Sequence, residues 1–474
     1  FKQKTAYEIS LGLVGSEMCI RDRNNVINRL TNSLQKINKN SIPANVIEIG
    51  KNCIIDTVGV TIAGSVTPSA KKIYFSANET YKDGNCTILG SDKTLNAAGA
   101  ALTNGAAAHA LDFDDNCYAG IVHGSAVVLP TVLALAQENS LNGQKLLISF
   151  IAGLEIQFGI AKAFSNGIYD RGWWTTSILG VLGSAASASK LLDLDTQATS
   201  NALALAAVGA GATRAVRGTH AKHFYCGLAA ERGIIAAKLA KNGAIGPLNA
   251  FEDVNGLTRV LNDGKFDPTK IDNIGKDFSI IDPGVDIKKY PVCYASHAAI
   301  DGVKSILEDN NLNSATIKKV ICTVPPVVGS NLTFSHPKNI SEAQFSLEFA
   351  LATIIKDGSL NLSHLTDKFI NSASLKLIQK KIVMNVDNLP LEQSNNKNIC
   401  PEWADIEIIM NDGVVYKTFV SSPIGSSKRA LPEELLYKKF YDCVSHADTG
   451  KNVEKLYENL RNIESAHNLK SIFS

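Results

Sequence analysis

Acidic side chains crowd a short stretch of the chain. Asp112, Asp114 and Asp115 lie within four residues, after an alanine-rich segment that ends at His109, and His123 follows Asp112 by eleven residues. Carboxylates this close repel one another unless a cation, a helix N-terminus or solvent compensates their charge. The cluster is therefore a candidate for acid–base catalysis through Asp112 and His123. The alternative is a solvated loop that brings negative charge to the start of the next helix.

Basic side chains gather further along, where Arg214, Arg217, His220, Lys222 and His223 fall within ten residues. Guanidinium groups bind carboxylates in a bidentate manner, so this stretch predicts capture of an anionic substrate. Neighbouring cations also disfavour the protonated form of Lys222, which could then serve as a base. Two alternatives are a solvated basic loop and a zinc site at His220 and His223, which has no third ligand at a suitable spacing.

His297 closes a third stretch, residues 288 to 297, at which the character of the sequence changes. Clefts often form where two parts of a chain meet, so we expect this histidine to face one. A lone histidine beside an apolar helix start is also a common structural residue. Cys293 lies in the same stretch without a partner at nucleophile spacing, and we interpret it as structural.

Familiar cofactor motifs are missing from the sequence. It contains no G-x-G-x-x-G after a strand, no phosphate-binding G-x-x-x-x-G-K-[ST], no H-E-x-x-H and no G-x-S-x-G. We therefore expect no cofactor and no metal. Carboxylates, a cationic loop and a junction histidine suit proton abstraction next to a carboxylate, with the cations stabilising the enediolate-like charge that develops.

Long helices must position these side chains. From Ser41 onward apolar residues recur at helical spacing, and glycine or asparagine separates the segments. Several segments are apolar nearly all round, so they should be buried inside a large helical body. The helices are predicted at residues 95 to 111, 125 to 137, 143 to 165, 178 to 192, 196 to 210 and 226 to 241.

The pattern changes near Tyr290. Residues 317 to 325 and 405 to 410 alternate with β-branched side chains, and Asn411-Asp412-Gly413 after them is a hairpin signal. Residues 345 to 358 and 372 to 382, between these strands, are predicted as helices. The sequence thus predicts a mainly α protein with an α+β unit, after which an amphipathic helical segment returns to the helical body.

Four segments follow from these patterns. We predict a helical domain from 24 to 288, an α+β domain from 289 to 426 and a helical return from 427 to 474. Residues 1 to 23 make a poor signal peptide, because their short apolar stretch is broken by Glu17 and followed by charged residues. We interpret them as a non-native extension and exclude them from the fold.

Composition excludes several classes of protein. Lys and Arg number 47 against 45 Asp and Glu, so no overall charge draws nucleic acid or an anionic membrane. No uninterrupted apolar run approaches the ~20 residues that span a bilayer. The nine cysteines are widely spaced without a C-x-x-C pair, which favours reduced thiols over a disulfide framework. We expect a soluble, cytoplasmic protein.

Five blocks, taken together, resemble the MmgE/PrpD family. The blocks are NGAAAHALDFDD, HGSAVVLPTVLALAQ, RAVRGTHAKHFYCGLAAERG, KYPVCYASHAAID and AQFSLEFALATIIKDG, starting at residues 104, 123, 214, 289 and 343. The family includes 2-methylcitrate dehydratase of propionate catabolism, cis-aconitate decarboxylase and iminodisuccinate epimerase. The resemblance implies a large all-helical domain built from the N- and C-terminal segments, a smaller α+β lid, an active site in the cleft between them, and a homodimer.

The resemblance also implies roles for single residues. The family's active-site aspartate falls on Asp112, its histidine block on His123, its motif lysine on Lys222 and its junction histidine on His297. Arg214 takes the place of the arginine that would hold a substrate carboxylate. Lys222 and His297 would then handle the proton at the reacting carbon, and Asp112 with His123 would orient or protonate the departing group. Either Lys222 or His297 is preferred as the base over Asp112, because clustered negative charge repels an anionic substrate.

Three positions depart from the family pattern, and we expect them to contact the substrate. Trp174 stands where relatives commonly have a histidine, in Gly-Trp-Trp-Thr-Thr instead of Gly-Phe-His-Pro-Thr. Asn116 stands where a threonine is common, and Tyr294 where many relatives have an arginine. Losing an imidazole and a cation suggests a different arrangement of substrate carboxylates, with Trp174 contributing packing and one N–H donor.

We therefore expect a cofactor-independent lyase that abstracts the proton alpha to a carboxylate of a small di- or tricarboxylate. Dehydration of a 2-methylcitrate-like hydroxy acid is the leading expectation. Epimerisation or decarboxylation, of the iminodisuccinate or cis-aconitate type, is the alternative within the family. A protein that binds carboxylates without turnover is the alternative from another class.

Overall fold

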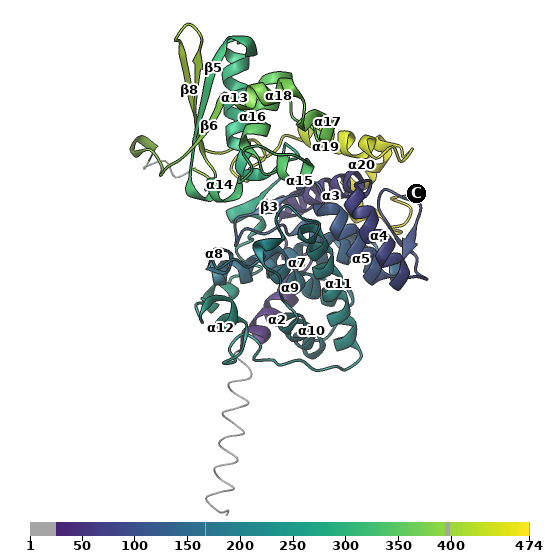
Figure 1. The fold of residues 1–474 in the computed structure, drawn as a ribbon. Helices are drawn as coiled ribbons and strands as arrows, with labels where there is room; N and C mark the ends of the chain where they lie inside the picture. Colours follow the sequence, from purple (N-terminus) through teal and green to yellow (C-terminus); the bar gives the residue numbers. More distant parts are fainter. Residues whose placement is uncertain (1–24, 166, 394–398, 474) are drawn as a thin grey trace, which may run out of the picture.

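The computed structural model describes residues 25–165, 167–393 and 399–473. They form a helical body with a smaller α+β part beside it, which we call the lid (Figure 1). The extension predicted at residues 1 to 23 lies outside the described residues. The helices of the body are α2 (Val26–Lys36), α3 (Ala44–Ser65), α4 (Pro68–Thr80), α5 (Ala97–His109), α6 (Ser125–Glu138), α7 (Gly143–Phe164), α8 (Gly167–Asp170), α9 (Thr175–Leu191), α10 (Thr196–Val208), α11 (Ala221–Lys241) and α12 (Leu257–Asn262).

The predicted helices of the body are confirmed. Asn96, Asn142 and Asp195 cap α5, α7 and α10, and each side chain accepts a hydrogen bond from the backbone N–H three residues on. The structure adds α2 and α4, which the sequence patterns above do not predict. In α4 only Ser69, Ala70 and Ala77 are buried, so its apolar periodicity is weak. In α2 the buried Val26, Ile27, Leu30 and Leu34 do recur at helical spacing, so its pattern was present in the sequence and was overlooked.

Helix α7 is long and apolar enough to cross a membrane by length and composition alone. However, 89% of its most apolar window is buried inside the protein. It packs against α9 and α6 in the main hydrophobic core. Its composition is therefore explained by burial in the body.

Helices α5 and α11 cross closely, and this crossing positions the site. A Cβ atom added to Gly227 would lie 2.1 Å from the carbonyl oxygen of Leu102, and one added to Gly105 would lie 2.9 Å from Gly227 Cα. Neither position tolerates a side chain without a shift of the backbone. The contact brings the C-terminal end of α5, at His109, beside the first turn of α11, which carries Lys222.

The lid packs its helices against a four-stranded sheet in the order β6-β5-β7-β8. Strand β7 runs antiparallel to β5 and to β8, whereas β6 runs parallel to β5. The hairpin between β7 and β8 turns at Asn411-Asp412-Gly413, as predicted. The elements of the lid are α13 (His297–Asp309), β5 (Ile317–Val324), α14 (Pro326–Asn331), α15 (Ile340–Ala343), α16 (Leu347–Asp357), α17 (Asp367–Ile370), α18 (Ala373–Gln379), β6 (Ile382–Val386), β7 (Ala404–Met410) and β8 (Val415–Val420).

One prediction in the lid is wrong in part. The helix predicted over 372 to 382 ends at Gln379, and Ile382 begins β6. Ile382 pairs with Val320 of β5 and is buried in the lid core. The short run of apolar residues fits a helix or a strand equally well, and only the pairing with β5 decides between them.

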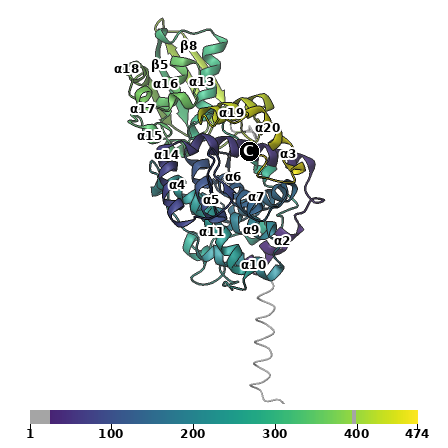
Figure 2. The same cartoon turned by 90° about the vertical axis from the view of Figure 1, so that its right-hand side faces the viewer.

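Two short antiparallel pairs complete the body: β1 (Cys86–Thr87) with β2 (Thr94–Leu95), and β3 (Asn116–Cys117) with β4 (Val285–Asp286). After the lid the chain continues into α19 (Glu433–His446) and α20 (Val453–Arg461). Helix α19 packs against α3 of the body, and Figure 2 shows both yellow helices along the side of the body that faces the lid. The mainly α fold with an α+β part is thus confirmed.

A buried ion pair fixes this return to the body. Lys439 of α19 lies 2.5 Å from Asp56 of α3, and both side chains are at most 5% exposed. The same ammonium group donates a hydrogen bond to the Phe113 carbonyl oxygen at 2.8 Å. Lys439 therefore connects the C-terminal helix to the body and to the loop that carries Asp112, Asp114 and Asp115, which we call the acidic loop.

Replacing Lys439 by Met should lower the free energy of unfolding by about 3–5 kcal/mol, because the Asp56 carboxylate would stay buried without its partner. Urea denaturation followed by circular dichroism measures the loss. The neighbouring Lys438 is 70% exposed and pairs with Asp442 at the surface, so the matched K438M variant should change stability by at most ~0.5 kcal/mol. Equal losses in the two variants would contradict a specific role for the buried pair.

Candidate active site

A cavity of about 790 Å³ lies between the body and the lid. The acidic loop and the start of α11 form its body side, and residues around α15 and α17 form its lid side. Its polar residues include His109, Asp112, His220, Lys222, His223, Gln344, Asp367 and His446, and its apolar residues include Leu111, Ile340, Phe345, Leu362 and Leu365. The volume suits a small carboxylic acid, and both domains must be in place to enclose it.

Asp112 is the centre of this arrangement. Its carboxylate makes a short ion pair with Lys222, and its other oxygen lies 3.2 Å from the ammonium group of Lys288. Burial alone would raise the pKa of Asp112, but the two lysines hold it well below its usual range. Asp112 is therefore an ionised carboxylate. Its negative charge stabilises two ammonium groups that are buried beside it.

The backbone around Asp112 explains why its side chain points into the body. Leu111 and Phe113 belong to the lid's hydrophobic cluster, and Asp112 between them has φ 50°. This left-handed conformation costs a non-glycine residue free energy and persists only where its surroundings enforce it. Here the two apolar neighbours are buried on one side, while Lys222 and Lys288 bind the carboxylate on the other.

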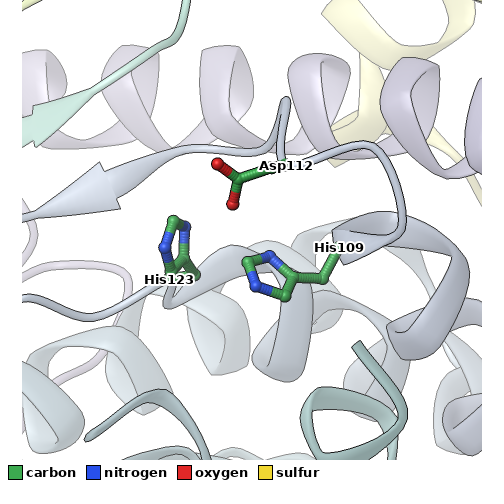
Figure 3. A group of neighbouring side chains, drawn as sticks. All are labelled: His109, Asp112 and His123. Carbon is green, nitrogen blue, oxygen red and sulfur yellow. The ribbon is translucent and has the colours of Figure 1, made fainter. Parts of the chain in front are cut away.

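Two imidazole rings face the Asp112 carboxylate, as Figure 3 shows. His109 Nδ1 lies 2.9 and 2.8 Å from the two carboxylate oxygens of Asp114. His123 Nδ1 lies 2.8 Å from the backbone carbonyl oxygen of Asp115. Each ring is thus held through Nδ1, and the ring centroids are 4.5 Å apart.

His109, Asp112 and His123 offer one ligand atom each within 4.8 Å of one another, a spacing that could hold a metal ion. Histidines held through Nδ1 by oxygen atoms are typical of metal sites. The charges do not fit, however, because Lys222 and Lys288 already bind the carboxylate and would repel a divalent cation. The cluster therefore does not fit a divalent metal ion.

Aromatic rings surround the ammonium group of Lys222. It lies 5.3 Å from the centroid of Trp174 and 5.1 Å from that of Phe345, which belongs to the lid. The Trp174 ring also lies 5.7 Å from His109 and 6.0 Å from His123. The position that departs from the family pattern therefore lies in the centre of the cluster, where its ring limits the space beside Lys222.

Several buried polar atoms at this place have no hydrogen-bond partner among the described residues. They include His109 Nε2, Trp174 Nε1 and His223 Nε2. An unpaired buried polar group is costly, and a group of them beside a cavity indicates a polar ligand or water. A carboxylate placed here could accept hydrogen bonds from Trp174 and from the remaining N–H donors of Lys222.

Arg214, predicted to hold a substrate carboxylate, lies outside the residues that line the cavity. Its guanidinium group stacks on Tyr169 at 3.8 Å from the ring centroid and donates to the Tyr169 carbonyl oxygen. Arg217 bridges to the lid instead, because it donates to the Ser330 carbonyl oxygen and to Asn331 Oδ1. The basic stretch therefore divides between the cavity wall and a contact with α14.

Three further predicted residues are buried in the protein. Asn116 is buried on β3, opposite Asp286 of β4. The ring of His297 is fully buried, with Nε2 3.3 Å from the Val292 carbonyl oxygen. Tyr294 packs on this ring at 4.9 Å between centroids. None of these three side chains lines the cavity, so their roles toward substrate stay predictions.

The structure adds residues that sequence reasoning missed. Lys288 is 1% exposed at its side chain and donates to the Asp112 carbonyl oxygen at 2.6 Å. Gln344 reaches from the lid to the Leu111 carbonyl oxygen at 2.5 Å. Glu402 is buried and accepts a hydrogen bond from Tyr118. For Lys288 the sequence did offer a signal, the pair of lysines in KKYP. The contacts of Gln344 and Glu402 depend on how distant segments of the chain meet, so no local pattern indicates them.

Two family descriptions match the chain. The MmgE/PrpD N-terminal domain matches residues 28–269, and the MmgE/PrpD C-terminal domain matches residues 290–462. The chain belongs to the MmgE/PrpD family. The boundary between the two matches falls near the stretch that contains Lys288, where the chain passes from the body to the lid.

Three relatives of the chain carry the name cis-aconitate decarboxylase. The cis-aconitate decarboxylase of Homo sapiens is 28% identical over 438 residues, which cover 88% of each chain. That of Mus musculus is 27% identical over 442 residues, covering 90% of this chain and 88% of the relative. That of Aspergillus terreus is 24% identical over 422 residues, covering 84% and 85%.

Glu402 makes stability depend on pH. Burial raises its pKa to about 7, although Tyr118 and Lys288 act in the opposite direction. The unfolded carboxyl titrates near ~4.3, so between about pH 4 and 7 the folded state binds more protons and Glu402 contributes less stability as pH rises. Relative to the wild type, E402Q should thus gain on the order of 2 kcal/mol between pH 5 and pH 8.

Urea titrations of both proteins at a series of pH values measure this difference. The exposed Glu434, at the start of α19, supplies the matched E434Q control, which should show no gain of this size between pH 5 and pH 8. A constant difference for E402Q would show that Glu402 is ionised in the folded protein at pH 5.

Proposed function

We propose that the protein is a cofactor-independent lyase that removes carbon dioxide from a small tricarboxylate of the cis-aconitate type. The observation that carries the proposal is the buried Lys222 ammonium group at the cavity wall, beside polar atoms without a hydrogen-bond partner in the described part of the chain. The names of the relatives support decarboxylation over the dehydration that the sequence favoured. Dehydration of a 2-methylcitrate-like acid becomes the second candidate.

The two sides of the cavity suit the two ends of such a reaction. A carboxylate that stays on the product gains from Lys222 and the N–H of Trp174. A carboxylate that leaves as carbon dioxide loses its charge, which an apolar wall favours. Ile340, Phe345 and Leu365 supply that wall from the lid.

The chemistry requires one proton. When a carboxylate leaves from a carbon next to an alkene, the broken C–C bond supplies the electron pair of a new double bond. The old π pair then takes a proton at the far alkene carbon, and carbon dioxide departs. Dehydration instead removes a proton from carbon and expels a hydroxyl group. Both reactions need a group that moves a proton at a fixed carbon.

An assay with several acids tests the proposal. Purified protein is incubated with cis-aconitate, trans-aconitate, citrate, 2-methylcitrate and iminodisuccinate, and products are resolved by proton NMR. We expect carbon dioxide and a dicarboxylate alkene from cis-aconitate. Loss of water without carbon dioxide would establish the dehydration candidate, and conversion of none of the acids would overturn the proposed function.

Replacing Lys222 by Met should lower kcat/KM by on the order of 10² or more, because a buried charged hydrogen bond to the substrate is lost. Lys238 on the same helix is 42% exposed and pairs with Glu138, so K238M is the matched control and should keep wild-type kinetics. Unchanged kinetics in K222M would contradict a role of Lys222 at the substrate.

A further inference from the structure

His109 and Asp114 form a buried pair at the end of α5. The His109 side chain has no exposed area, nor has that of Asp114, and Nδ1 lies within 2.9 Å of both carboxylate oxygens. Asp114 also lies 3.3 Å from His123 Nδ1. Although burial alone would raise the pKa of Asp114, the two histidines hold it well below its usual range. The partner of His109 is therefore an ionised carboxylate.

This pairing sets the tautomer of His109. A carboxylate only accepts hydrogen bonds, so the proton of the neutral imidazole is on Nδ1. The lone pair is then on Nε2, which is buried without a hydrogen-bond partner among the described residues. His109 lines the cavity, and its ring faces Asp112 (Figure 3). A carboxylate that orients an imidazole and stabilises its charged form is a recurring device of acid–base catalysis.

We propose that His109 transfers the proton at the reacting carbon of the substrate, with Asp114 as its positioning residue. This proposal rests on the function proposed above and assigns a catalytic residue to it. The alternatives expected from the sequence are less suited. Lys222 is bound to Asp112, and His297 lies behind the cavity wall with Nε2 directed at the Val292 carbonyl oxygen.

The negative charge of the substrate favours transfer of the proton from His109 to the substrate. Burial lowers the pKa of His109 to about 4, against the effect of Asp114, while Lys222 and His123 lower it further. His223 of α11 is a further titratable neighbour. A bound polycarboxylate favours the imidazolium ion, which then gives its Nε2 proton to the far alkene carbon as carbon dioxide leaves. The neutral ring regains a proton from solvent after release, whereas in a dehydration Nε2 would take the proton from carbon.

Kinetics test the assignment. H109Q should lower kcat by on the order of 10² or more while KM changes little, because proton transfer rather than binding is lost. D114N should lower kcat less and shift its pH profile. The exposed His467 supplies the matched H467Q control, which should be unchanged. In H109A, added imidazole should restore part of the activity, which a merely structural role of His109 would not allow.

Nitrogen-15 NMR of histidine side chains tests the pair without turnover. The resonance that disappears in H109Q should show a protonated Nδ1 and a free Nε2 in the wild type, and D114N should convert it to a mixture of tautomers. A protonated Nε2 in the wild type overturns the proposal, as does wild-type kcat in H109Q. If the wild type converts none of the acids, the proposed function fails, while the tautomer still decides whether His109 presents the lone pair that the assignment requires.

Discussion

Three consecutive carbonyl oxygens hold the acidic loop in place, and the rest of the site depends on them. Leu111 accepts from Gln344 of the lid, Asp112 from Lys288 of the connecting segment, and Phe113 from Lys439 of the C-terminal helix. Each donor comes from a different part of the chain, so the loop reaches its conformation only when body, lid and C-terminal return have all assembled. The geometry of the active site therefore depends on all three parts of the fold.

The same loop makes a costly arrangement of charge tolerable. Buried ammonium and carboxylate groups lose hydration that their mutual attraction only partly replaces. Asp112 lies between Lys222 and Lys288, so each ammonium group has the carboxylate as a partner. Beside them His109 stays neutral at pH 7, because burial outweighs the attraction of Asp114. Fixed charges thus lie next to one ring whose protonation can change, which is the condition for moving a proton on demand.

Much of the fold could be predicted from local patterns. Periodicity gave the buried helices and the hairpin, and ordered motifs gave the family. The placement of Asp112 and Lys222 on one cavity, with Trp174 packed against Lys222, fits the motifs that contain them. What local patterns could not give is the partner of each polar atom. The contacts of Gln344, Lys288 and Lys439 join residues more than a hundred positions apart, and nothing in their own neighbourhoods encodes such a pairing.

Helices α5 and α11 cross at two glycines, without side chains between them, and this has an evolutionary consequence. Where Gly105 and Gly227 meet, even one methyl group would force the two helices apart and carry His109 away from Lys222. Family members can therefore vary the rings and amides that line the hollow, and so exchange one acid for another, more easily than they can vary these two glycines. Changes of specificity should accumulate at positions such as Trp174, while the distance between the helices that carry the chemistry stays the same across descendants.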